Sequence, residues 1–276
     1  ASPSPPPPSA SPSPPATAPP DQVMEKDPHI HFAHGGQADF RGRDGQLYAF
    51  LSAPGLAVNL KTQDATFDVP NIHSSSNTLL VDGSFITEVH LIALVGGAKR
   101  KLLRASCLGG EIDENNHLAV RGDCGGRPFY VKRGGRRTCD ELTVRVRHAS
   151  ATISAGNWSV AIKGARSYAT AGPEHRLDLG FSAMGDFAAR NQPHGLFGQS
   201  FSSPLPRVGK VDVYPTSGHF RTSAMAEGAI DGEAASYEVA SPYATAFHFT
   251  RFDERLQPQD QTTETPPPPS EAGAAR

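Results

Sequence analysis

The chain has little excess charge of either sign and no long apolar run. Its 26 Lys and Arg residues nearly balance 28 Asp and Glu residues, which gives a formal net charge of −2 at pH 7. This balance argues against nucleic acid or an anionic membrane as the main partner. No apolar stretch approaches the roughly 20 residues that a membrane-spanning helix needs. We therefore expect no nucleic-acid partner and no membrane span.

Cysteine is also scarce. The chain has three, Cys107, Cys124 and Cys139, and no two of them form a CxxC pair, so a zinc cluster is not expected. In an oxidising compartment one disulfide and one free thiol is the natural distribution, and three buried thiols is the alternative. Cys124 and Cys139 would close the shorter loop, but the sequence does not select the pair.

Both ends of the chain lack the residues that form a core. Residues 1–20 are only Ala, Ser, Pro and Thr, with ten prolines, and residues 257–276 are similar in kind. Because proline fixes φ and removes a backbone donor, we expect these tails to be disordered or extended as polyproline II. One domain is expected over residues 21–256. The sequence shows no starting Met and no signal peptide, so we interpret it as a processed chain or a fragment.

The central region has the two-residue periodicity of half-buried strands. Apolar and polar residues alternate over 142–148, 157–163 and 176–182. These patterns predict an all-β fold, an antiparallel β sandwich or a barrel-like domain. Further strands are expected at 46–51, 56–60, 85–95, 210–214, 237–240 and 246–252. Short helices are expected only at 181–192 and 223–236.

Three histidines near the start of this region raise the question of a metal site. His29 and His31 would share one side of a strand, His34 follows in a turn, and two such imidazoles can chelate zinc or copper. The alternative is structural: Asp27-Pro28-His29 is also typical of a chain entering a domain. The favoured hypothesis is the structural one, with no cofactor.

No other motif requires catalysis. There is no G-x-S-x-G elbow, and the Gly-rich segments lack phosphate-loop and dinucleotide patterns. A basic loop at 132–138 could contact an acidic polysaccharide or could simply be solvated. Asn157-Trp158-Ser159 is a sequon for N-glycosylation, although Trp158 lies in an expected strand.

The tails resemble hydroxyproline-rich glycoproteins of plant and green-algal cell walls, such as extensins and pherophorins. The resemblance is carried by two runs of four prolines, Pro5, Pro6, Pro7 and Pro8, and Pro266, Pro267, Pro268 and Pro269. It implies hydroxylation of these prolines and O-linked glycans on them.

The central region resembles von Willebrand factor type D domains. The opening Asp27-Pro28-His29 is similar to their G-D-P-H segment. The later HGLFGQ, which includes Gly195, Leu196, Gly198 and Gln199, is similar to their G-L-C-G-N segment. It is closer to a segment of the C-terminal domain of inter-alpha-trypsin inhibitor heavy chains. Phe197 replaces the family's Cys, and residues 199–204 have no carboxylate for calcium. The resemblance therefore implies the fold and an extracellular, non-catalytic role only.

Together these features predict a non-enzymatic structural or adhesive module of a cell-wall, matrix or flagellar-surface glycoprotein. Its expected partners are other such glycoproteins or polysaccharide, with self-assembly as a further option. Two alternatives stay open. One is a carbohydrate-binding module for acidic glycans, and the other is a metal-dependent hydrolase that uses His29, His31 and His34.

Overall fold

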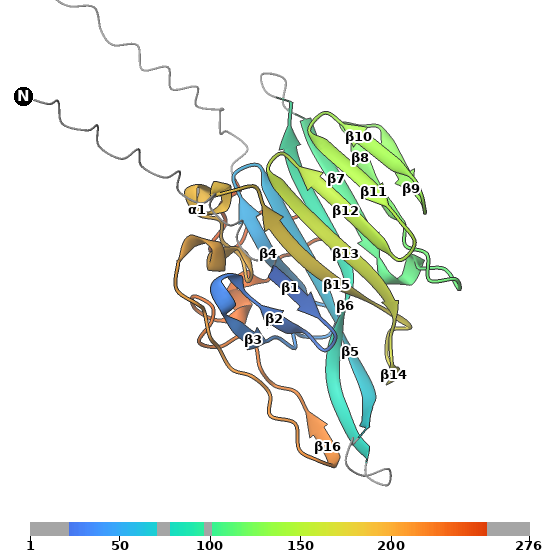
Figure 1. Cartoon of the computed structure of the whole chain (residues 1–276), viewed down its shortest axis with the longest axis vertical. Coiled ribbons are helices and arrows are strands. Elements are labelled where there is room, and N and C mark those ends of the chain that lie inside the picture. Colours follow the sequence, from blue (N-terminus) through green and yellow to red (C-terminus); the bar gives the residue numbers. More distant parts are fainter. Residues whose placement is uncertain (1–21, 71–77, 97–100, 253–276) are drawn as a thin grey trace, which may run out of the picture.

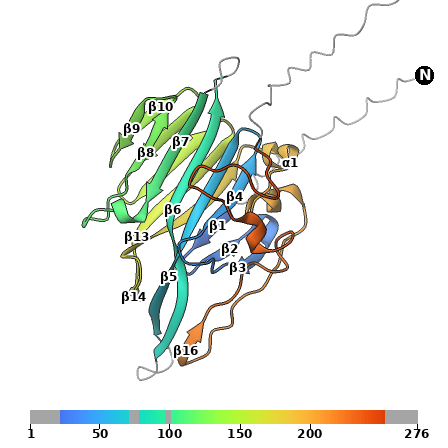
Figure 2. The same ribbon diagram turned by 180° about the vertical axis from the view of Figure 1, so that it is seen from behind.

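The computed structural model describes residues 22–70, 78–96 and 101–252. They form two sheets stacked face to face, seen from opposite sides in Figures 1 and 2. All strand pairs within them are antiparallel except β6 with β16, and neither sheet closes on itself within the described ranges. Of the two predicted forms, the sandwich is the observed one. The tail prolines Pro5–Pro8 and Pro266–Pro269 lie outside the described residues.

The first sheet combines strands from the start and from the middle of the chain. Its middle strands β11, β13 and β15 are the three segments whose alternation was clearest in the sequence, and their inward residues are buried as predicted. In spatial order the strands are β10 (Arg136–Cys139), β11 (Leu142–Val146), β12 (Ser150–Ala155), β13 (Trp158–Arg166), β15 (His175–Ala183), β1 (Gln22–Glu25), β2 (His29–His31) and β3 (Gln37–Asp39).

The second sheet is built on two long strands that each pair with several others. β5 (Leu56–Pro70) and β6 (Thr78–Val95) extend beyond the stacked region (Figure 1). The spatial order is β14 (Ala169–Ala171), β5, β6, β7 (Lys101–Leu108), β8 (Val120–Cys124) and β9 (Pro128–Val131), while β4 (Leu47–Ala53) pairs with β5 and β16 (Gly218–Arg221) pairs with β6.

The main core lies between the sheets. Val144, Ile153 and Val160 from the first sheet join Val58, Leu91 and many others in a single buried cluster. A ring cluster of Phe32, Phe50, Phe181 and Phe197 extends it, with centroids 5.1 to 5.9 Å apart. Ring pairs at these distances stabilise a core beyond their buried area.

Helix is limited to short pieces. The elements are α1 (Phe187–Asn191), η1 (Ala33–Gly35), η2 (Gly109–Glu111), η3 (Gly198–Ser202) and η4 (Ala234–Tyr237). α1 lies in the segment 181–192, whose first residues belong to β15 instead. Within the described ranges, no helix has the length and apolar character required to cross a membrane.

Four predictions in the last quarter of the domain were wrong. The segment 223–236 is helical only at its end, because Ala226, Gly228 and Gly232 have φ of 62°, 85° and 71°. The segments 210–214, 237–240 and 246–252 form no strand. They run over the sandwich and bind it through isolated hydrogen bonds. They therefore do not form the continuous ladders that a strand requires.

Candidate functional site

The residues of the first sequence motif lie at the edge of the first sheet and bind other parts of the chain. The Asp27 carboxylate accepts hydrogen bonds from the Ser84 backbone N–H, at 3.0 Å, and from the Tyr214 hydroxyl. His29 Nδ1 lies 2.7 Å from Asp39 Oδ1, and Asp39 Oδ2 accepts the backbone N–H of residue 212 at 2.8 Å. The motif therefore connects β2 to β3, to β6 and to the segment before β16.

The pKa values of Asp27 and His29 are both raised, for different reasons. Burial raises the pKa of the Asp27 carboxyl, against the lowering effect of the Tyr214 and Ser84 hydrogen bonds. The hydrogen bond to Asp39 raises the pKa of His29, against the effect of its burial. This hydrogen bond joins β2 to β3, in which His29 and Asp39 are directly paired.

The structure does not bring the three histidines together as ligands. His29 faces Asp39, His31 is exposed one pleat further along β2, and His34 is exposed in η1 with φ of 60°. Among residues 22–70, 78–96 and 101–252, no group of three or more His, Cys, Asp or Glu side chains is arranged to hold a metal ion. We therefore base no proposal on a metal.

The second motif, HGLFGQ, anchors the chain to β4. The backbone N–H groups of Leu196 and Phe197 donate to Ala49 and Phe50. Gly195 has φ of 101°, and a Cβ there would lie 2.5 Å from the Phe50 carbonyl oxygen. Only glycine fits this close approach without strain.

Gln199 ends this motif and is 1% exposed. Its Nε2 donates to Gly195 O and to the Tyr237 hydroxyl, both at 3.0 Å, and its Oε1 accepts the Asp231 backbone N–H at 3.0 Å. His194 stacks on Tyr237 and on Phe249, with centroids 6.0 and 4.6 Å away. The motif thus holds the irregular C-terminal segment on the sandwich.

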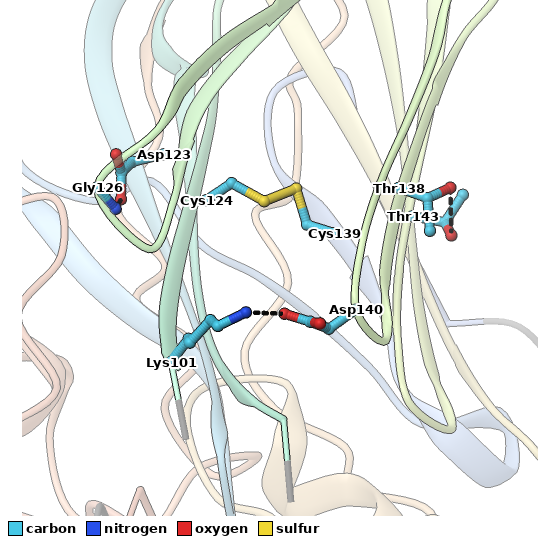
Figure 3. The surroundings of a disulfide bond; sticks show 8 residues. All are labelled: Lys101, Asp123, Cys124, Gly126, Thr138, Cys139, Asp140 and Thr143. Carbon is cyan, nitrogen blue, oxygen red and sulfur yellow. Dashed lines mark hydrogen bonds and ion pairs between the residues drawn. A yellow bond between two sulfur atoms is a disulfide. The ribbon is translucent and has the colours of Figure 1, made fainter. Parts of the chain in front are cut away.

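The disulfide joins Cys124 to Cys139, and Cys107 is a free, buried thiol. Figure 3 shows the bond crossing from the end of β8 in the second sheet to the end of β10 in the first. An ion pair between Lys101 and Asp140, at 3.1 Å, lies beside it. Burial raises the pKa of the Cys107 thiol far above its usual range, which keeps that thiol protonated and unreactive.

The sequon lies on an accessible turn. Asn157 is exposed in the two-residue loop between β12 and β13, after Gly156 with φ of 54°. Trp158 points to the opposite side, where it is 4% exposed and packs on Phe187 and Phe201. The strand position of Trp158 therefore does not cover the Asn157 side chain.

The outward face of the first sheet carries no contact described above. It contains a groove of about 430 Å³ over β12, β13, β15 and β1. Small and polar side chains form its floor: Ser150, Thr152, Ala161, Lys163, Gly180 and Ser182. The sequence analysis did not single out these residues, although their alternation with buried neighbours places them on the outer face.

Comparison with known proteins gives no match: no family model fits the chain, and no curated protein is significantly similar to it. The resemblances carried by the two motifs and by the tails therefore stay predictions. The geometry assigns the motif residues Asp27, His29, Gly195 and Gln199 contacts within the fold.

Proposed function

We propose that this chain is a non-enzymatic extracellular module, structural or adhesive, of a hydroxyproline-rich cell-wall, matrix or flagellar-surface glycoprotein. The observation that carries the proposal is the Cys124–Cys139 disulfide between the two sheets. Disulfides persist in oxidising compartments and are rare in the cytosol. The exposed sequon at Asn157 and the proline runs of the tails support the same location.

The contacts of the motif residues support a structural role. The acid–base groups of the first motif each take part in hydrogen bonds that connect segments of the fold. They are the imidazole of His29 and the carboxylates of Asp27 and Asp39. Such a sandwich, placed between glycosylated polyproline tails, would present its sheet faces and loops to other matrix components.

The test is mass spectrometry of the protein from its natural source, with free thiols blocked in denaturant before any reductant is added, because Cys107 is buried in the folded protein. We expect one blocked thiol, at Cys107, one disulfide, N-glycan on Asn157, and pentose-spaced masses on the tail peptides. Three blocked thiols together with bare tails would contradict the proposal. A stoichiometric metal in the native protein that is lost on denaturation would favour the hydrolase hypothesis instead.

A further inference from the structure

The register of the first sheet aligns its outward residues into straight rows across the strands. One row crosses six strands, and neighbours in it are directly paired: Arg136, Arg145, Thr152, Ala161, Gly180 and Val23. The adjacent row consists only of hydroxyl side chains: Thr138, Thr143, Ser154, Ser159 and Ser182. A face made of small hydroxyl side chains offers many hydrogen-bond donors and acceptors at once.

Two arginines face each other at one end of the first row. Arg136 and Arg145 are both exposed and directly opposite, an arrangement that destabilises a strand pair. No ion pair in the described part of the chain includes either of them, or Arg147 or Lys163 beside the row. About half of the other basic side chains in the described ranges, such as Arg41, have a carboxylate partner.

The charge of this region contrasts with that of the chain. Residues 120–147 contain eight Lys or Arg and three Asp or Glu, a net charge of +5, whereas the whole chain carries −2. The one carboxylate in the groove, Asp178, is neutralised by the Arg176 guanidinium and accepts the Lys26 backbone N–H at 3.0 Å. The outward face therefore has positive charge at its β10–β11 edge, beside the groove, and at Lys163 within the groove.

We propose that this face binds an acidic polysaccharide laid across β10, β11, β12, β13 and β15, strands that lie side by side in Figure 1. Arg136 and Arg145 contact its carboxylate or sulfate groups, and the hydroxyl row contacts its sugar hydroxyls. No outward position on these five strands is aromatic, so the sugar rings have no stacking platform here and recognition depends on charge. The inference names a partner for the matrix module and rests on that proposed function.

The test uses the 276-residue chain, expressed by secretion, and three immobilised probes: polygalacturonate, dextran sulfate and neutral dextran. The variant is Arg136→Ser/Arg145→Ser. Its control, Arg166→Ser/Arg221→Ser, removes the same charge from exposed positions away from the groove. We expect the wild type to bind one or both acidic probes but not dextran, and to release them with added salt. The first variant should bind roughly tenfold more weakly, and the control should bind like the wild type.

A steric variant distinguishes binding in the groove from nonspecific attraction between opposite charges. Ala161→Leu fills the floor at an exposed position without changing charge, and it should also weaken binding. Thermal unfolding should show that Arg136→Ser/Arg145→Ser is at least as stable as the wild type, because the opposed charges are gone. Equal loss of binding in the control double variant, or equal competition by duplex DNA, would overturn the proposal.

Failure of this inference can be told from failure of the proposed function. A secreted, disulfide-bonded glycoprotein that binds neither acidic probe would refute the glycan site and leave the matrix role standing. A protein with three free thiols and bare tails would refute the matrix role whatever its binding.

Discussion

The disulfide between Cys124 and Cys139 should account for a large share of the stability of the sandwich. The bond closes a loop of 15 residues. Restricting the unfolded chain by a loop of that length stabilises the folded state by about 3 kcal/mol in the chain-entropy account. For a domain of this size, that corresponds to a fall in Tm of roughly 6 to 12 °C on its removal.

The assay is urea and thermal unfolding of Cys124→Ala/Cys139→Ala beside the wild type, with Asp140→Asn as the matched control. Asp140→Asn removes the neighbouring Lys101–Asp140 ion pair but keeps the disulfide. Because both partners of that pair are largely exposed, the control should lose less than about 1 kcal/mol. A double variant no less stable than this control would refute the reasoning.

Two further predictions concern buried and half-buried polar groups. Gln199→Leu leaves the Asp231 backbone N–H without its partner and removes the hydrogen bond that the Tyr237 hydroxyl accepts, while that hydroxyl still donates to Asp231 O. Urea unfolding should therefore show a loss of about 3 kcal/mol; an unchanged midpoint would contradict the role given to the motif. The hydrogen bond from His90, helped by Lys61 against burial, lowers the pKa of Glu88 from its usual 4.5 to about 2. The ionised Glu88 carboxylate therefore stabilises the folded state above pH 4.5, and this contribution is lost as the pH falls toward 2. The wild type should lose more unfolding free energy between pH 7 and pH 3 than Glu88→Gln does. An equal loss in both proteins would count against this assignment.

The sequence predicted the regular half of the fold and failed on the irregular half for a physical reason. Strands such as β11 and β13 bury one face against a sheet, so burial imposes a period of two that can be read directly. Apart from β16, the described part of the chain after residue 203 is held by single long-range hydrogen bonds. For example, Asn59 Nδ2 donates to Pro242 O and Ala244 O at 3.0 and 2.8 Å. Such bonds leave no periodic pattern.

The candidate sites divide in the same way. The pairing of Cys124 with Cys139 was open in the sequence because loop length alone does not bring two strands of different sheets together. The pairing of two arginines across β10 and β11 could not be predicted from the sequence for a related reason. Arg136 faces Arg145 only because the β10–β11 turn, with Asp140 at φ of 49°, sets that register. A shift by one residue would place Arg136 on the other face.

The motif residues that the sequence analysis singled out as candidate site residues have their polar groups engaged in hydrogen bonds within the fold. His29, Asp27 and Gln199 bind strands and segments of the chain itself, so their substitution should change stability before it changes recognition. A binding partner would then contact a surface whose side chains the fold does not use for its own contacts. The outward face of the first sheet fits this condition, because it keeps two opposed arginines at a cost to the fold that an anionic partner would offset.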